Sequence, residues 1–216
     1  MKKRLLTAIA VSFCIGSYAQ TGKGKIILGG SVGFNSNKVN SQATQKATSF
    51  NLGPSIGFFT SENIAIGIDL AYDYQKRNPY SQTVTIDNTD YISGASGNKS
   101  ESIRVSPFLR AYLDLHEKVK LFGQLNAGIQ FGRGRIIDVI PTPDQKNKTT
   151  TYLASLEPGI AFFPNKKIAI ELKVPLVNYF NQKTKYDNST AEDLTYSNLT
   201  VGSNLNSPVL GINFHF

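Results

Sequence analysis

Cysteine, histidine and tryptophan are nearly missing from this chain of 216 residues, which has one cysteine, two histidines and no tryptophan. The cysteine, Cys14, lies in an N-terminal segment that we expect to be cleaved, so the mature chain has no disulfide and no thiol chemistry. No pair of histidines or cysteines has the spacing of metal ligands. These absences exclude a disulfide scaffold and a thiol enzyme, and we expect neither a metal site nor any other cofactor.

Long apolar runs are also absent once the N-terminus has been passed. No stretch there approaches the ~18 continuous apolar residues of a transmembrane helix. Charged residues make up 18% of the chain and the mean hydropathy is -0.19, values that by themselves suggest a soluble protein. That interpretation is incomplete, because a membrane-spanning strand alternates apolar and polar residues and gives no hydropathy peak.

The first twenty residues, MKKRLLTAIAVSFCIGSYAQ, have the order of a secretory signal peptide. Residues 2–4 are all basic, residues 5–16 are mainly apolar, and the small residues Ser17 and Ala19 precede a cleavage site before Gln20. We therefore predict a signal peptide over residues 1–19 and one exported domain over residues 20–216.

Phe13 precedes Cys14, where a lipoprotein signal would have a small residue, so we do not expect lipidation. Cleavage removes three of the 23 basic residues and none of the 15 acidic ones, which leaves a net charge of 20 − 15 = +5. Neither this mild charge nor the residue pattern provides the basic stripe of a nucleic-acid-binding protein, so we expect no nucleic-acid partner.

The remaining chain is a series of segments in which apolar residues recur at every second position. This period predicts β-strands, and no segment has a helical period. Eight such segments cover residues 25–34, 50–59, 64–74, 103–115, 119–131, 152–163, 168–180 and 207–216.

The connections between these segments alternate in length. Short ones cover residues 60–63, 116–118 and 164–167, and long polar ones cover roughly residues 36–47, 76–101, 133–149 and 181–199. One hairpin pattern recurs, since PSIGFFTSENIAIGIDL (54–70) and PGIAFFPNKKIAIELKV (158–174) match in register. Short turns on one side and long loops on the other predict an all-β, eight-stranded antiparallel up-and-down barrel rather than a Greek-key sandwich.

The two faces of these strands differ in a way that predicts which one is inside. The apolar face carries no charge, whereas the second face carries five basic and five acidic residues: Lys25, Asp69, Asp73, Arg104, Arg110, Asp114, Lys120, Glu157, Glu171 and Lys173. Glycines interleave with these charges, which suits a narrow interior where long side chains need room. We interpret the second face as the interior with a charge network, and the apolar face as lipid-facing. The alternative is a soluble barrel with a solvated charged face and an apolar interior.

Aromatic residues on the apolar face gather toward both ends of the strands. Phe58, Phe162, Phe214 and Phe216 lie toward the short turns, and Phe34, Phe50, Tyr72, Tyr74, Phe131, Tyr152 and Phe180 toward the long loops. Two aromatic girdles around an aliphatic belt match the two interfaces of a bilayer. Prolines fit less well, and we predict that Pro54, Pro107, Pro158 and Pro208 mark bulges or rim positions, with a bulge near Ser207 where the apolar parity slips.

An exported chain of eight alternating strands that ends in GINFHF resembles the small outer-membrane β-barrel proteins of Gram-negative bacteria, of the porin-like or OmpX/OmpA-barrel type. The resemblance covers residues 24–216 and includes the SPF strand around Pro107. It implies an outer-membrane location, periplasmic termini and extracellular long loops. It also implies that the barrel-assembly machinery is a partner and that Phe216 is the terminal aromatic which that machinery reads.

Enzymes of this family that modify the acyl chains of lipid A place a histidine with a serine and an acidic residue near the outer leaflet. His116 lies in a short turn and His215 beside the C-terminus, so both are at the opposite end of the predicted barrel. We therefore expect no catalytic residues and no enzyme activity.

Basic residues gather at or just beyond the long-loop rim. They include Lys76, Arg77, Arg133, Arg135, Lys183 and Lys185, together with Lys46, Lys146 and Lys148. Our hypothesis is that they meet the phosphates of outer-membrane lipopolysaccharide. The alternative is ordinary loop solubility, because acidic residues share the same loops.

The sequence as a whole predicts an integral outer-membrane barrel with a structural or loop-mediated interaction role and an unknown extracellular partner. A narrow passive pore is one alternative, although ten interior charges would fill the lumen of eight strands. A soluble lipocalin-like ligand carrier is the other alternative, and it requires an apolar interior.

Overall fold

The computed structural model describes residues 21–40, 44–86, 89–137, 146–187, 193–202 and 209–216. The predicted signal peptide over residues 1–19 lies outside these residues. The described chain forms strands β1 (Ile26–Asn40), β2 (Thr44–Ser61), β3 (Ile64–Arg77), β4 (Tyr80–Ile86), β5 (Thr89–Ala95), β6 (Gly97–His116), β7 (Val119–Ile137), β8 (Lys146–Asn165), β9 (Ile168–Lys173), β10 (Val177–Tyr186), β11 (Leu194–Val201) and β12 (Val209–His215). The part of the chain that the structure describes contains no helix long and apolar enough to cross a membrane.

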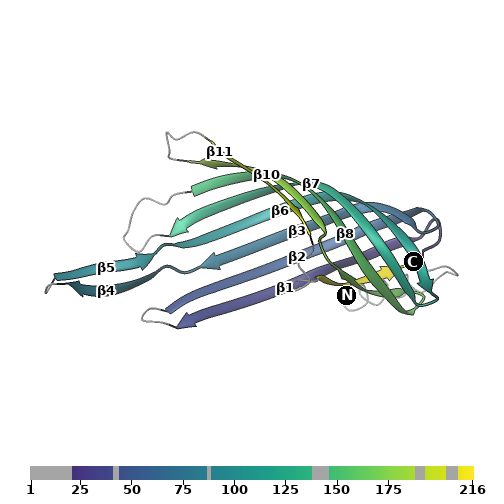
Figure 1. The fold of residues 1–216 in the computed structure, drawn as a ribbon, viewed down its shortest axis with the longest axis horizontal. Coiled ribbons are helices and arrows are strands. Elements are labelled where there is room, and N and C mark those ends of the chain that lie inside the picture. Colours follow the sequence, from purple (N-terminus) through teal and green to yellow (C-terminus); the bar gives the residue numbers. More distant parts are fainter. Residues whose placement is uncertain (1–20, 41–43, 87–88, 138–145, 188–192, 203–208) are drawn as a thin grey trace, which may run out of the picture.

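The strands close into one antiparallel barrel. Its wall runs β1–β2–β3–β6–β7–β8–β9–β12, and β12 pairs with β1 to complete the circle (Figure 1). β9 and β10 follow one another along the same edge of β8 and together form one position of the wall. β11 pairs with β10, as β12 pairs with β9. The predicted all-β, eight-stranded, antiparallel up-and-down barrel is confirmed.

One end of the barrel has tight turns, as the short connections predict. Residues 62–63, 117–118 and 166–167 separate the paired strands there. Asn63 has φ of 63°, a left-handed conformation that asparagine tolerates better than most residues. The C-terminus lies at this end, which we call the short-turn end (Figure 1).

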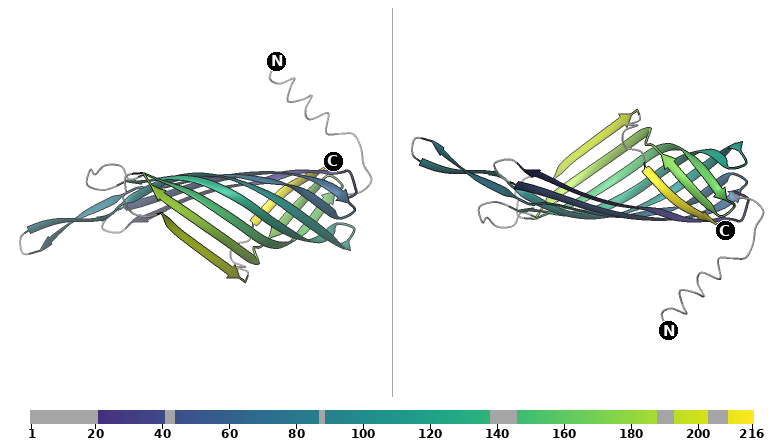
Figure 2. Two further views of the ribbon diagram at one scale, coloured as in Figure 1. Left: turned by 90° about the horizontal axis from the view of Figure 1, so that it is seen from above. Right: turned by 90° about the horizontal axis from the view of Figure 1, so that it is seen from below.

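The opposite end, which we call the long-hairpin end, contains more strand than the periodicity predicts. β1 and β2 continue to residues 40 and 44, β7 and β8 to residues 137 and 146, and β11 begins at Leu194. β4 and β5 form a separate hairpin that extends beyond the barrel (Figure 2). The predicted long loops are therefore largely strand. Periodicity missed them because strands beyond a membrane belt need only backbone pairing and have no apolar face.

The seventh wall position contains an irregularity that the sequence analysis missed. Leu172 faces Ile160 and Val177 faces Leu156, so five steps along β9–β10 match four steps along β8. The extra residue lies around Pro175, and it reverses which side chains face outward. Tyr179 is consequently 43% exposed on the outside. Phe180 shares the inward parity and contacts the ring of Tyr196 at 5.6 Å. The assignment of Phe180 to an outer aromatic girdle was therefore wrong.

Two of the prolines predicted as bulges do not shift the register. Pairing around Pro54 and Pro107 keeps one alignment on both sides of each proline. Pro158 keeps its alignment with β7, but the one-residue shift between β8 and β9–β10 lies opposite it. The other shifts lie at the short turns, between Phe59 and Ser61, Asp114 and His116, and Phe162 and Asn165. A proline lacks one hydrogen-bond donor but adds no residue, so it need not offset the strands. Pro208 and the predicted bulge near Ser207 lie outside the described residues.

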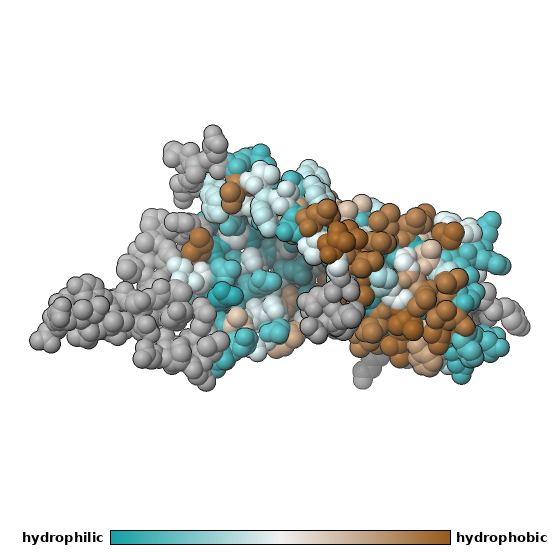
Figure 3. Space-filling model, in the orientation of Figure 1, coloured by the Kyte–Doolittle hydropathy of each residue, from teal (hydrophilic) through white to brown (hydrophobic). Residues whose placement is uncertain are grey.

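The apolar face of the strands is the outer face. Leu125, Ile66 and Ile212 are 53%, 50% and 51% exposed, and hydrophobic residues form a band on the visible face of the half next to the short turns (Figure 3). Hydrophilic residues border this band at the turn tips and across the long-hairpin half (Figure 3). An exposed apolar surface of this kind is unfavourable in water and favourable in contact with lipid.

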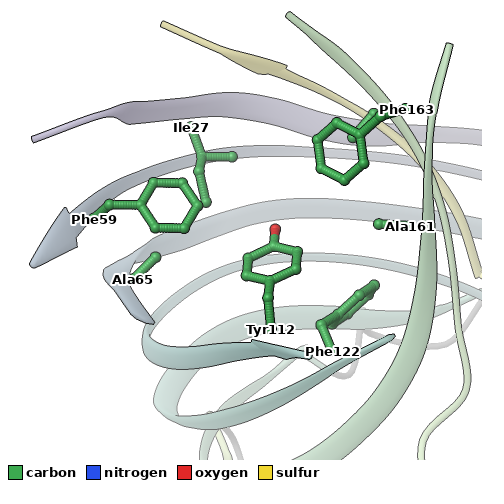
Figure 4. Packing of buried hydrophobic residues seen from close by; sticks show 8 residues of the cluster. Ile27, Phe59, Ala65, Tyr112, Phe122, Ala161 and Phe163 are labelled. Carbon is green, nitrogen blue, oxygen red and sulfur yellow. The ribbon is translucent and has the colours of Figure 1, made fainter. Parts of the chain in front are cut away.

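Among the described residues, the apolar cluster of the interior lies near the short-turn end. This cluster, which we call the aromatic plug, lies inside the wall (Figure 4), and its members are Ile27, Phe59, Ala65, Tyr112, Phe122, Ala161, Phe163 and Ala169. The sequence analysis predicted a polar interior throughout, so the plug is a correction. Tyr112, Phe122 and Phe163 belong to the inward parity, and Arg110, Asp114 and Lys120 share that parity beside the first two. Counting inward aromatic residues together with the inward charges would have located the plug.

Candidate functional site: an interior polar network and an outward cationic belt

A fully buried ion pair lies on the side of the plug that faces the long-hairpin end. Arg110 Nη1 on β6 and Glu171 Oε2 on β9 are 2.9 Å apart, and their side chains are 4% and 3% exposed. The hydroxyl of Tyr112 lies 2.9 Å from the guanidinium, and the ring of Phe122 lies 4.7 Å from Cζ of Arg110. The pair thus has both the hydrogen bonds and the packing that a buried charge requires.

Neutral polar side chains extend this pair into a continuous network around the lumen. Gln124 accepts from Arg110 Nε at 2.7 Å and donates to Asn126 Oδ1 at 2.7 Å. Asn126 donates to Ser155 at 3.0 Å, and Ser155 donates to Glu157 at 2.9 Å. The chain of bonds ends at β9, where Lys173 Nζ lies 2.7 Å from Glu157 Oε2.

Asp69 is attached to the same network. Its carboxylate accepts from Ser55 Oγ at 2.5 Å and from Gln124 Nε2 at 2.8 Å. Lys120 and Asp114 form a separate pair at the short-turn end, where Lys120 also donates to Thr21 Oγ1 at 2.9 Å. That hydrogen bond ties the start of the described chain to β7.

The sequence analysis missed the neutral members of this network, Ser55, Gln124, Asn126 and Ser155. All four share the inward parity, which would have located them if amides and hydroxyls had been counted with the charges. Three predicted members do not join these bonds. Lys25 is half-buried near the start of β1, and Asp73 is half-buried on β3 toward the long-hairpin end. Arg104 lines a cavity on the long-hairpin side of the plug.

That cavity, which we call the chamber, has a volume of about 320 Å³. Six charged residues line it: Asp69, Arg104, Arg110, Glu157, Glu171 and Lys173. Pro175 and Asn178, from the irregular stretch between β9 and β10, line it as well. The chamber is therefore polar, and the plug lies between it and the short turns.

Glycines provide the space for the plug. A Cβ added at Gly159 would overlap the ring of Phe122 and lie 2.7 Å from the carbonyl oxygen of Leu172. Gly67 is crowded in the same way by the ring of Phe108. Gly123, by contrast, faces outward and has nothing within 4 Å of the same position. Interior glycines thus make room for large side chains from neighbouring strands.

Basic side chains form a belt on the outer face at the long-hairpin end. Lys76 pairs in register with Lys99, Lys99 with Arg135, and Arg135 with Lys146, so four cations stand in one row across β3, β6, β7 and β8. We call the outward set the cationic belt; it comprises Lys76, Lys99, Arg133, Arg135, Lys146, Lys148, Lys183 and Lys185. A shallow groove of about 480 Å³ runs along the part of it on β6, β7 and β8.

Within the part of the chain that the structure describes, few acids accompany the belt. Lys148 lies 3.3 Å from Asp187, while Asp193 lies 2.9 Å from Lys183 and 3.5 Å from Lys185. The hydrogen bond from Lys183 holds the pKa of the exposed Asp193 carboxyl below its usual value. Of the predicted rim residues, Arg77 is the exception, because its register partner Asn98 shares the inward parity of β6.

The remaining predicted residues lie at the short-turn end. The backbone of Phe216 exchanges two hydrogen bonds with Ile26, both 2.9 Å long, and its ring lies 6.4 Å from that of Phe214. His116 is exposed at a turn, and His215 is buried among the rings of Phe59, Tyr112 and Phe163. Within the described residues, no group of three histidines, cysteines or acids could hold a metal ion.

Comparisons with known proteins agree with this architecture. The sequence matches the model of the outer membrane protein beta-barrel domain over residues 5–206, and no curated protein matches it. The structure is similar to the outer membrane protein OprG from Pseudomonas aeruginosa, with a TM-score of 0.50 and 14% identity over 92% of this chain and 99% of that one. The translocator domain of autotransporter NalP from Neisseria meningitidis has a TM-score of 0.46 and 13% identity over 92% of this chain, which spans 65% of that domain. At 14% identity the likeness to OprG supports the fold alone.

Proposed function

The chain belongs to the outer membrane protein beta-barrel domain family and is an outer-membrane protein, and on this basis we propose that its cationic belt binds phosphate groups of the outer leaflet. The role is structural: the barrel holds phosphorylated glycolipid, the chemistry of lipopolysaccharide, against its wall. The long-hairpin end faces the exterior and the short-turn end faces the periplasm. The row Lys76–Lys99–Arg135–Lys146 is the observation that carries this proposal.

Electrostatics within the belt favours an external anion. Neighbouring strands are about 4.8 Å apart, and like charges directly opposite one another destabilise a sheet. Among the described residues, the eight cations are accompanied by three acids, Glu101, Asp187 and Asp193. Phosphates neutralise such a row, and the two arginines can bind them in bidentate fashion.

The depth of the belt fits lipid headgroups. Arg133 lies two residues beyond Phe131, and Lys148 lies four residues from Tyr152, whose outward rings are 55% and 58% exposed. Aromatic side chains of this kind occupy the boundary between hydrocarbon and headgroups. Cations one or two outward positions further along the strands therefore reach the level of the phosphates.

Binding of lipopolysaccharide to the refolded barrel in nanodiscs tests the proposal. Replacing Lys76, Lys99, Arg135 and Lys146 with serine should weaken binding by at least about tenfold, since one basic residue near an anionic surface contributes about 1 kcal/mol. The matched control replaces Lys23, Lys118, Lys166 and Lys167 at the short-turn end, which removes the same charge and should leave binding unchanged. Equal losses in the two variants, or no loss in the first, would refute the proposal.

Catalysis and solute conduction are not part of this proposal. The two histidines lie at the short-turn end, far from the belt, which supports a barrel that is not an enzyme. The plug and the Arg110–Glu171 pair fill the lumen below the chamber, which argues against a passive pore. The soluble lipocalin-like alternative needs an apolar cavity, whereas the chamber is lined by charges.

Single-channel recording in planar bilayers addresses the pore alternative. We expect the wild-type barrel to show no steady conductance. Shortening the plug with Phe59→Ala and Phe163→Ala should produce openings, because both rings are completely buried inside the wall. Stable conductance of the wild-type protein would establish the pore instead.

A further inference from the structure

The chamber above the plug contains three cations and three anions, but these groups are not equally satisfied. Arg110 is paired with Glu171, and Lys173 is paired with Glu157. Asp69 accepts hydrogen bonds from two neutral donors, Ser55 and Gln124. Five of the six charged groups therefore already have strong partners within the barrel.

Arg104 is the sixth group, and within the described part of the chain it has no ion pair within contact distance, although its charge acts on the carboxylate of Glu157. Its Nε is buried and has no hydrogen-bond partner among the residues that the structure describes. Its register neighbours on β3 and β7 are Ala71 and Gln130, and the amide of Gln130 donates to Ser102 instead. A buried donor without a partner is costly, and native proteins normally satisfy it with a protein group, water or a ligand.

We propose that Arg104 holds a small oxyanion, a carboxylate or a phosphate, in the chamber. A guanidinium presents its N–H donors as a planar fork that matches two oxygens of such an anion. Arg110 and Lys173 could not serve in its place, since an anion there would have to displace Glu171 or Glu157. Hydroxyl and amide groups of Ser31, Asn51 and Asn178 line the same cavity and supply further donors.

The size and enclosure of the chamber restrict the ligand. About 320 Å³ accommodates a small solute with its water but not a glycolipid headgroup. The bound species is therefore water-soluble and distinct from the lipid phosphates at the belt. Ordered water alone is the competing occupant, because the cavity is polar enough to hold it.

Equilibrium dialysis of the refolded full barrel tests this inference, in a maltoside detergent that contributes no phosphate. Radiolabelled inorganic phosphate and acetate are the two probes, with chloride keeping the ionic strength constant. We expect saturable binding of at least one probe, and Arg104→Gln should weaken that binding by about tenfold or more, because a charge-assisted hydrogen-bond pair is lost. Arg104→Lys keeps the charge without the fork and should retain part of the affinity.

Two controls keep the result interpretable. Arg77→Gln makes the same substitution on the inward face beyond the chamber and should leave binding unchanged. The four-residue belt variant should also keep this site, which separates it from the proposed lipid contact. Heat-modifiability on a gel shows that each variant is folded.

A direct readout comes from the Arg Nε–H signals in a ¹⁵N-labelled sample. The signal of Arg104 should shift saturably with the bound probe, while that of Arg110 should not move, because its Nε already donates to Gln124. No saturable binding of either probe would show that water alone occupies the chamber. Undiminished binding in Arg104→Gln would place the anion elsewhere, and either outcome overturns the inference.

Discussion

The two halves of this barrel are stabilised in different ways. In the half next to the short turns, aromatic rings, glycines that accommodate them and a buried ion pair fill the lumen, and the hydrophobic band lies on the outside. The half toward the long hairpins has a polar lumen, exposed strand extensions and outward cations. Stability therefore concentrates in the first half, and the second half is free to bind ligands. Substitutions of the same kind should cost much more in the first half than in the second.

The largest effect should come from the buried pair. Glu171→Gln leaves the Arg110 cation in the lumen without its counter-charge, and the free energy of unfolding should fall by about 3–5 kcal/mol. Urea unfolding in lipid vesicles, followed by heat-modifiability, measures this difference. The double variant Arg110→Met, Glu171→Met should recover most of the loss, because no charge is then stranded. If the single variant is as stable as the wild type, the pair does not hold this half together.

A charge on the outer surface tests the hydrophobic belt. Leu125→Arg places a cation in the middle of the apolar band and should lower the free energy of unfolding by about 2–4 kcal/mol in lipid. Thr150→Arg places the same charge on the outer face beside Lys148, where the expected cost is about 0–1 kcal/mol. The same urea titration in vesicles compares them. Equal costs would mean that lipid does not contact the two levels differently.

Two glycines test the crowding inside the barrel. Gly159→Ala forces the ring of Phe122 and the neighbouring strand apart, and we expect it to cost about 1–3 kcal/mol. Gly123→Ala adds the same methyl group on the open outer face, where nothing lies within 4 Å, and should be neutral. Unfolding midpoints of the two variants decide the matter. A neutral Gly159→Ala would show that the plug is loosely packed.

The smallest effect should come from the exposed pair of Lys183 and Asp193. Asp193→Asn should leave the unfolding midpoint unchanged within error at pH 7, since solvent screens exposed ion pairs. The pKa of Asp193 is lowered by Lys183, so any contribution is present above the ordinary aspartate pKa and disappears as the pH falls through the lowered value. The difference between variant and wild type should thus stay near zero from pH 7 downward. A clear loss of stability at pH 7 alone would show that the hairpin end is held more firmly than we infer.

Much of the barrel follows from local alternation. Ile64 to Tyr74, with its apolar residues at every even position, predicts a strand that meets a different medium on each face, and the glycines interleaved with the charges of the second face indicated the interior. The pairs Arg110–Glu171 and Lys173–Glu157 were expected as members of one face, but not as partners. Partnership depends on the strand register, which places residue 110 of β6 near residue 171 of β9 across the lumen.

Other features could not be read from alternation. The extra residue around Pro175 turned Phe180 inward, and it lies opposite Pro158, while Pro54 and Pro107 left the register intact. A bulge depends on how two strands align, which neither strand encodes alone. The aromatic plug was missed for a different reason, since only charges and glycines of the inward parity were counted and the Phe and Tyr residues beside them were not.

By itself, the sequence determined the all-β class, the eight wall positions, the outward apolar face and the position of the tight turns, because each depends on the two-residue period and on local turn chemistry. Only the tertiary structure reveals the plug, the route of the polar network, the row of belt cations and the Nε of Arg104, which is unpartnered among the described residues. These features depend on residues far apart in the chain being brought to the same height in the lumen or on the wall. Shear and register set those heights when the barrel closes, so only the closed sheet determines which side chains meet.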